Sequence, residues 1–295
     1  MEFLRDPTLW PQQIVNGLLI GGVYVLVALG FSIVWGIMNI VNLAHGAFIM
    51  LGAFTTYFIW QATGLDPFLT LPIAAAVLFT VGYATQATVI NFVVRAPLLV
   101  TLLLTFGIEI FISNVALYKW KSDIRSVSPA YEGNSIEIGT LLIPVTKLGA
   151  LGLAIVITAL LALFMNRTKL GRAIRAVGMD LTAARLMGIN IPRTYALTFA
   201  LGAALAACAG VLISATQPFD PNIGASYTTR AFVICVLGGL GSIPAVLVGG
   251  LLFGLIETIG SVVFGAGYKE AITFVVLVVF LVLRPQGLMG KEGYR

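Results

Sequence analysis

The feature that most constrains this chain is a series of apolar runs of about 20 residues, the length that a helix needs to cross ~30 Å of hydrocarbon. A soluble core could not bury so much apolar surface, because 59% of the 295 residues are hydrophobic and only 10% are charged. A transmembrane β-barrel would instead show alternating segments of roughly 10 residues. We therefore expect an all-α, polytopic transmembrane helical bundle of about eight or nine spans. The runs lie at 14–35, 37–60, 68–92, 97–118, 141–165 and 194–215, then in a glycine-broken stretch at 231–263 and a last run at 270–283.

The basic residues predict the orientation of these spans. Segment 166–193 holds Arg167, Lys169, Arg172, Arg175, Arg185 and Arg193 against a single acid, Asp180. Loops rich in lysine and arginine stay on the cytoplasmic side, so we expect this loop to be cytoplasmic. Counting spans back then places the N-terminus and the 119–140 loop outside and the short turn at Arg95 inside.

The C-terminal tail carries Arg284, Lys291 and Arg295, which favour the cytoplasmic side as well. That requires the 231–263 stretch to cross twice, or to re-enter the membrane and then cross it. The sequence Gly238-Gly239-Leu240-Gly241-Ser242, followed by Pro244, is a plausible break. We expect a short half-helix before this break and a fuller helix from Ala245. No soluble domain is evident, so residues 1–295 are expected to form one membrane domain.

The cytoplasmic loop is predicted to contain a short helix that is capped at both ends. Asp180 is a good N-cap, and residues 181–187 would form about two turns. Gly188 stands where a left-handed residue ends a helix, and Ile189 can pack back over the last turn. Such a helix could be gripped by a soluble partner. The alternative is a solvated basic loop that only sets the topology.

Residues 171–188 resemble the coupling loop of ABC importer permeases, and their details resemble the LivH-type permeases of branched-chain amino acid importers. The similarity runs nearly end to end and includes segments 41–46 (VNLAHG), 199–206, 209–212, 236–244 and 283–288. Two stretches depart from the family pattern. The third span is followed by Val94-Arg95-Ala96-Pro97-Leu98, where the family often has an arginine–proline pair, and the 119–140 loop shows no family pattern.

The resemblance implies a permease subunit of an ATP-binding-cassette importer in the prokaryotic plasma (inner) membrane. Its solutes would be branched-chain or related amino acids, or urea and short amides as in some relatives. The implied partners are a second permease chain, usually a paralogue, two cytoplasmic ATPases, an extracytoplasmic solute-binding protein and membrane lipid. The residues predicted to couple to the ATPases are Gly171, Arg172, Arg175, Asp180, Ala183, Ala184, Gly188 and Ile189.

Polar residues inside the predicted spans are candidates for the solute pathway. Asn39, Asn42 and His45 would fall on one face of a continuous second helix, either lining the pathway or bonding neighbouring helices. A proton relay at His45 is a less favoured alternative. Glu109 lies mid-span, where an ionisable residue is a functional candidate, although it could be neutral or hydrogen-bonded to a neighbouring helix. Glu257 lies nearer a span end and is expected to be interfacial and structural.

The break at Gly238, Gly239, Gly241 and Ser242 is the remaining pathway candidate. Half-helix ends are where transporters often place solute contacts, and the alternative is a plain turn between two spans. No metal site or cofactor is expected, because His45 is the only histidine and Cys208 and Cys235 lack ligand spacing. The cysteines are expected to be small packing residues.

Other classes of function fit the sequence less well. The chain contains no Gly-x-x-x-x-Gly-Lys-Ser/Thr phosphate loop, so it is not expected to hydrolyse ATP. An ion- or proton-coupled secondary transporter is the alternative, for which inverted repeats and an ionisable relay would be expected. A membrane enzyme would need a convergent catalytic cluster, and a nucleic-acid surface would need a basic stripe with interleaved aromatic residues. Neither pattern is present.

Overall fold

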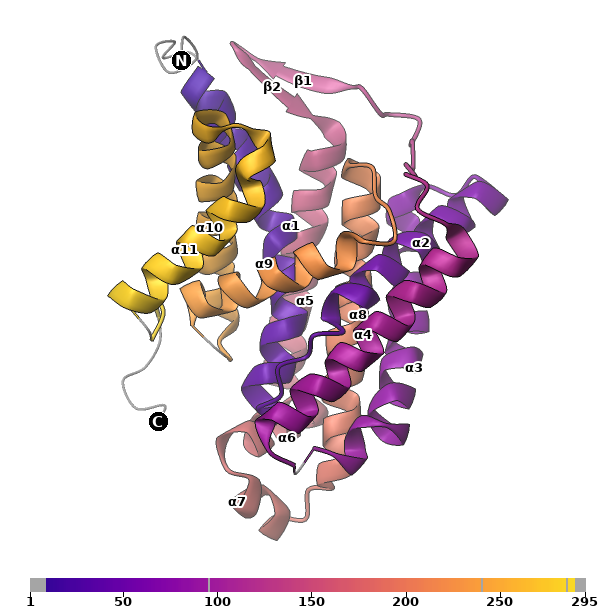
Figure 1. Cartoon of the computed structure of the whole chain (residues 1–295), viewed down its shortest axis with the longest axis vertical. Coiled ribbons are helices and arrows are strands. Elements are labelled where there is room, and N and C mark those ends of the chain that lie inside the picture. The colour runs from indigo at the N-terminus through magenta and orange to yellow at the C-terminus, as the bar shows by residue number, and fades with distance from the viewer. Residues whose placement is uncertain (1–8, 95, 240, 285, 290–295) are drawn as a thin grey trace.

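The computed structural model describes residues 9–94, 96–239, 241–284 and 286–289, and within them the chain forms a bundle of helices with one small hairpin (Figure 1). The first half contains α1 (Leu9–Met38), α2 (His45–Thr63), η2 (Pro67–Thr70), α3 (Leu71–Thr88), η3 (Ile90–Phe92), α4 (Leu98–Trp120), β1 (Ser135–Ile138) and β2 (Leu141–Pro144). The second half contains α5 (Val145–Arg167), α6 (Lys169–Met179), α7 (Leu181–Leu186), α8 (Ile191–Thr216), α9 (Ile223–Gly238), α10 (Ile243–Phe264), η4 (Ala266–Tyr268) and α11 (Lys269–Leu283).

Within the described residues, seven helices are long and apolar enough to cross a membrane, which confirms the expected all-α transmembrane bundle. Five of them are α1, α4, α5, α8 and α10, and the other two are α3 and α11 extended by short 3-10 turns. Two further helices account for the difference from the predicted number of spans. The α2 helix is 19 residues long but richer in polar residues, and α9 has only 16 residues. At 1.5 Å per residue, α9 is about 24 Å long and falls short of a full crossing.

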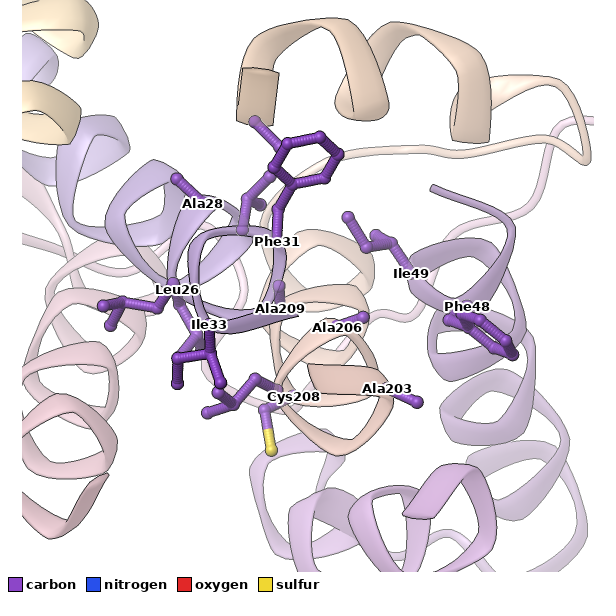
Figure 2. Packing of buried hydrophobic residues seen from close by; sticks show 14 of the residues in the cluster. Leu26, Ala28, Phe31, Ile33, Phe48, Ile49, Ala203, Ala206, Cys208 and Ala209 are labelled. Carbon is purple, nitrogen blue, oxygen red and sulfur yellow. The ribbon is translucent and has the colours of Figure 1, made fainter. Parts of the chain in front are cut away.

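The centre of the bundle is made by α1 and α8. In the most apolar 18 residues of each span, 89% of the residues are buried in α1 and 83% in α8. In α4 and α11 only 11% are buried. Figure 2 shows Ala206 and Ala209 of α8 with α1 on one side and Ile49 of α2 on the other, while Ala203 lies on the side of α8 that contacts Gly82 of α3. Small side chains let helices approach closely in a membrane bundle. A Cβ added at Gly210 of α8 would lie 2.1 Å from the Ile49 carbonyl oxygen, so only glycine fits this contact.

The predicted second span, 37–60, is wrong in its first third. Residues 37 and 38 end α1, residues 39–44 are not helical, and α2 begins only at His45. Asn39 closes α1 with a left-handed φ of +54°, an asparagine-tolerated conformation, and its N–H donates to the Trp35 carbonyl. Apolar content alone could not show this interruption, because the irregular segment is itself rich in valine, leucine and isoleucine.

The glycine-broken stretch contains two helices, as predicted, but the first of them begins at Ile223 rather than at Ala231. The α9 helix ends at Gly238 and α10 starts at Ile243. Gly239 and Gly241 hold φ values of +110° and +75°, which other residues rarely adopt, so the chain can turn sharply between the two helices. Leu240, and the predicted inside positions of Arg95, Lys291 and Arg295, lie outside the described residues.

The two long connections emerge at opposite ends of the bundle. The α6–α7 segment lies at one end, and the β1–β2 hairpin lies with the start of α1 at the other (Figure 1). The sequence did not predict this hairpin, and residues 141–144, expected to begin the fifth span, belong to β2. Gln12 of α1 holds the hairpin, because its side-chain amide donates to the Leu142 carbonyl and accepts from the Leu142 N–H, both at 2.8 Å.

Candidate functional site

The loop between α5 and α8 contains the predicted capped helix, α7. Oδ1 of Asp180 accepts from the N–H groups of Thr182 and Ala183 at 2.8 and 2.9 Å, which satisfies two free donors of the first turn. Gly188 adopts the predicted left-handed conformation with φ +78°. The N–H of Ile189 returns to the Ala184 carbonyl at 3.1 Å, and the Ile189 side chain packs over the loop. The geometry predicted for both ends of this helix is confirmed.

An additional helix, α6, precedes α7 and was missed by the sequence reasoning. It has one apolar face, on which Ile174 and Val177 are buried, and a basic face on which Arg172 and Arg175 are exposed. Thr168 caps its start by accepting from the Gly171 N–H at 2.9 Å. Gly171, one of the predicted coupling residues, is buried against α5. Its role in the structure is therefore packing, and it is not exposed to a partner. Spacing of apolar residues three apart within a charged loop was the signal available for α6.

The α6–α7 loop is fixed to the bundle from inside and open on its outer side. Ala184 of α7 is buried with Val177 and Ile191, whereas its neighbour Ala183 is exposed. Three large apolar side chains project outward instead: Met179, Leu186 and Met187 are 87%, 83% and 82% exposed. The α6 and α7 helices lie at one end of the molecule (Figure 1), and the same loop carries the exposed Arg172, Arg175 and Arg185. An exposed apolar group of this kind, bordered by charge, is typical of a surface that binds another protein.

Asn39, Asn42 and His45 do not share a helix face, which corrects the sequence prediction. Residues 39–44 are irregular, so the three-residue offsets no longer place these side chains on one side. Asn39 is exposed, and Asn42 is buried with its Oδ1 accepting from the Ala44 N–H at 3.1 Å. His45 is fully buried at the start of α2, with Nε2 2.8 Å from the Val27 carbonyl oxygen of α1, while its Nδ1 has no hydrogen-bond partner among the described residues.

Two threonines from distant helices satisfy the backbone of this irregular segment. The Thr105 hydroxyl of α4 accepts from the Leu43 N–H and lies within donating distance of the Val41 carbonyl, both at 3.2 Å. The Thr228 hydroxyl of α9 accepts from the Gly46 N–H at 2.8 Å and lies 3.3 Å from the Leu43 carbonyl oxygen. Irregular backbone at membrane depth needs such partners within the protein. The segment is therefore a junction that joins α1, α2, α4 and α9.

The second irregular segment, Gly238–Ser242, joins α9 to α10 and contacts other parts of the chain at Gly239 and Gly241, although Gly241 itself is exposed. Gly241 donates from its N–H to the Ser32 hydroxyl of α1 at 3.2 Å, and a Cβ at Gly36 would lie 2.6 Å from the Gly241 Cα. The last carbonyls of α9 are satisfied by the C-terminal segment, because Leu288 and Met289 donate to Leu237 and Gly238 at 2.9 and 3.1 Å. Gly238 and Gly239 are buried, and Ser242 makes no side-chain cap at the start of α10.

Glu109 lies in the middle of α4, as predicted, and is half-buried. Its Oε1 accepts from the Ser113 hydroxyl at 3.0 Å, one turn further along the same helix. Most of α4 is exposed on the chain taken alone, so this carboxyl group lies on a surface that another protein, water or lipid must cover. A carboxylate facing lipid at this depth is costly, which favours protein or water.

A buried ion cluster joins α9, α10 and α11, and the sequence reasoning missed its central residue. Arg230 donates to Glu257 Oε1 from Nε at 3.2 Å and from Nη2 at 3.0 Å, and Nη2 is also 3.3 Å from Glu270 Oε1. Glu257 was expected at the interface but is only 3% exposed, because α9 brings Arg230 against it. The Tyr227 ring lies 5.5 Å from the guanidinium carbon. A lone arginine within an apolar run was the available signal.

The chain is similar to known proteins over nearly its whole length. Residues 13–281 match the family model described as branched-chain amino acid transport system / permease component. The permease protein BraD of Pseudomonas aeruginosa is 34% identical over 293 residues, covering 95% of each chain, and LivH of Escherichia coli K12 is 34% identical over 295 residues with the same coverage. LivM of the same E. coli strain is 27% identical over 308 residues, covering 95% of this chain and 72% of its own length. No solved structure gives a significant match.

Proposed function

The chain belongs to the family of permease components of branched-chain amino acid transport systems, and from that premise we propose that it forms the translocation path of an ATP-driven importer. It is a multi-pass protein of the prokaryotic inner membrane, with seven helices suited to spanning it. Its solutes are branched-chain or related amino acids, the class named for its relatives BraD and LivH. Residues 1–295 act as one permease domain.

The observation that carries this proposal is the α6–α7 loop. A helix of six residues would not persist alone in water, yet α7 is capped by Asp180, closed by Gly188 and anchored by Ala184. It therefore keeps a fixed position while presenting Met179, Leu186 and Met187 to the outside. A rigid, protruding element with an apolar tip and basic surroundings suits docking to a partner on the cytoplasmic side. In an importer of this class, the partner is the ATPase.

The partners follow from what the chain lacks and from its relatives. Its sequence has no phosphate-binding loop, so separate cytoplasmic ATPases supply the hydrolysis. The similarity to LivM as well as to LivH supports a pair of paralogous permease chains. A solute-binding protein delivers the amino acid from the opposite side of the membrane, where the β1–β2 hairpin lies.

The solute path is proposed to run along the exposed face of α4 and past the two irregular segments. Glu109 favours a wet or protein-covered position for this face, since lipid would leave its carboxylate unpaired. The junction at residues 39–46 and the break at Gly238–Ser242 are places where helices stop inside the bundle, as they do around solutes in many transporters. Asn42 and His45 act here by holding the junction, because both are buried and bonded within the chain.

The deciding experiment replaces the two residues that cap α7, Asp180 and Gly188, in the complete transporter. Asp180→Ala withdraws the carboxylate that caps the helix, a loss of roughly 0.5–2 kcal/mol. Gly188→Val places a β-branched residue in a left-handed conformation, at a further cost of roughly 1–2 kcal/mol. We expect the double variant to insert and assemble, but to lose ATP-driven uptake and solute-stimulated ATP hydrolysis in proteoliposomes at matched complex levels.

A matched control is Gly133→Val, which places the same residue type in the left-handed conformation (φ +84°) of the loop at the opposite end. It should keep both activities. Wild-type uptake and stimulated hydrolysis in the Asp180/Gly188 variant would reduce the loop to a determinant of topology. Uptake that continues without the ATPases and collapses with the proton or sodium gradient would favour the secondary-transporter alternative.

A further inference from the structure

The last turn of α1 lies between the α6–α7 loop and the C-terminal end of α9. We call this end of α9, at Gly238, its inner end. On one side, Ile37 packs against the small cluster of Val177, Ala184 and Ile191 that anchors the loop. Gly178 of α6 lies against the same turn, because a Cβ built there would be 3.5 Å from the Gly36 carbonyl oxygen. The loop proposed to receive the ATPase therefore contacts this turn directly.

The opposite side of the same turn contacts the broken helix. The Trp35 and Phe232 rings stack with centroids 5.2 Å apart and planes inclined by 14°, which joins α1 to α9. A Cβ at Gly36 would lie 2.6 Å from the Gly241 Cα, so two backbones touch here with no side chain between them. A contact between backbones has no flexible side chain that could absorb a displacement.

The half-helix α9 is the element best placed to move in response. It is too short to cross the membrane alone, it ends at two left-handed glycines, and it carries Thr228, which bonds the junction before α2. Its inner end is held by the C-terminal segment, whose Gly287 is packed so closely that a Cβ would lie 2.8 Å from the Val236 carbonyl oxygen. A displacement of the break would move α9 and, through Thr228, the junction before α2. Because Thr105 of α4 bonds the same junction, the displacement would also reach the α4 face that carries Glu109.

We propose that Ile37 and Gly36 are positioning residues that transmit the motion of the ATPase-bound α6–α7 loop to the inner end of α9. The inference rests on the proposed function and names the element that receives the motion. The chain offers α8 as another path, since it follows α7 directly, but α8 packs mainly on α3, α2 and α1. The turn at residues 35–38 joins the loop to α9 within two residue contacts.

The main test introduces a methyl group into the backbone contact. Gly36→Ala pushes against the Gly241 backbone, so we expect uptake by the reconstituted complex with its ATPases and binding protein to fall by about tenfold, a typical size for allosteric coupling. ATP hydrolysis without solute should remain within about twofold of wild type, since the ATPase sites are on other subunits. The matched control is Gly152→Ala on α5, where an added Cβ meets nothing within 4 Å.

A second measurement reports on α9 itself. Thr229→Cys adds a thiol on the half-exposed face of α9, and it should react with a polar maleimide while the buried Cys208 and Cys235 stay protected. In the wild-type background we expect the reaction rate to differ between the nucleotide-free and vanadate-trapped states. This difference should vanish with Gly36→Ala and persist with Gly152→Ala.

A milder variant keeps the test decisive if Gly36→Ala does not assemble. Ile37→Ala removes the contact with the loop cluster but leaves the Gly36–Gly241 contact intact, and it should abolish the nucleotide-dependent labelling in the same way. Ile37→Val should retain most of it. Nucleotide-dependent labelling and full uptake in Ile37→Ala would overturn the proposal, as they would in Gly36→Ala. If Asp180→Ala with Gly188→Val uncouples transport while these variants do not, only the route is wrong, and the proposed function stands.

Discussion

At the scale of single residues, the strongest constraint is the charge buried at Arg230. A guanidinium inside an apolar bundle is tolerated only with partners, and Glu257 and Glu270 provide them from two other helices. Because Glu257 is nearly inaccessible to solvent, removing Arg230 would leave its carboxylate buried without a cationic partner. The cluster therefore fixes the middle of α9 against the α10–α11 pair.

We predict that Arg230→Met destabilises the protein by roughly 3–5 kcal/mol, the usual cost of breaking one half of a buried ion pair. The double variant Arg230→Met with Glu257→Met should recover most of this loss, because it leaves no uncompensated charge. Thermal unfolding midpoints of the detergent-purified protein measure both effects. The control is Glu270→Gln, whose half-exposed side chain should contribute only about 0–1 kcal/mol. A double variant as unstable as Arg230→Met would show that the pair contributes nothing through charge.

At the scale of secondary-structure elements, the two irregular segments distinguish this bundle from a set of plain spans. The α2 helix starts inside the protein, and its first turn is bonded by the Thr228 hydroxyl of α9 rather than by a side-chain cap at Ala44. Gly46 packs so closely on α9 that an added Cβ would lie 1.8 Å from the Gly224 carbonyl oxygen. The α2 and α9 helices should therefore move as a pair at this contact.

Thr228→Val tests whether the α9 hydroxyl holds the start of α2. Valine has nearly the same shape but leaves the buried Gly46 N–H without an acceptor, which should cost about 1–3 kcal/mol. Thr228→Ser keeps the hydroxyl and should be close to wild type. Unfolding midpoints under matched conditions compare the two, with Thr229→Val as control, because that hydroxyl bonds only to the Ala225 carbonyl of its own helix. Equal stability of the valine and serine variants would contradict the bridging role.

At the scale of the whole molecule, the two ends of the bundle differ, and the proposed function assigns them different roles. The α6–α7 loop, with its exposed methionines and leucine, lies at one end, and the hairpin held by Gln12 lies at the other (Figure 1). The basic residues of segment 166–193 predict which end is cytoplasmic. An importer needs this asymmetry, since hydrolysis and solute delivery occur on opposite sides of the membrane.

Cysteines placed at Thr182 and Asn134, both exposed, test this orientation. In sealed right-side-out vesicles, an impermeant maleimide should label Asn134→Cys at once and Thr182→Cys only after the membrane is permeabilised. Inverted vesicles should give the reverse pattern. Labelling of both positions from one side would contradict the assignment of ends and, with it, the docking of an ATPase at α7.

Features that depend on local chemistry could be predicted from the sequence. Membrane-length apolar runs predict the helices, Asp180 and Gly188 predict the ends of α7, and the glycines at 238–241 predict the break before α10. Each follows from residues that are near one another in the chain, so solvation, capping and backbone conformation are sufficient to predict them. The family resemblance rested on the same local segments.

Contacts between residues far apart in the chain depend on tertiary packing, which local patterns do not record. Tertiary packing interrupts the second span at residues 39–44, because the hydroxyl groups of Thr105 and Thr228 make hydrogen bonds to the backbone that a helix would otherwise supply. It also buried Glu257 against Arg230 and placed Gly36 against Gly241. These contacts join helices far apart in sequence. An apolar pattern records that a helix is buried but not which neighbour it touches, because in lipid both partner and solvent are apolar.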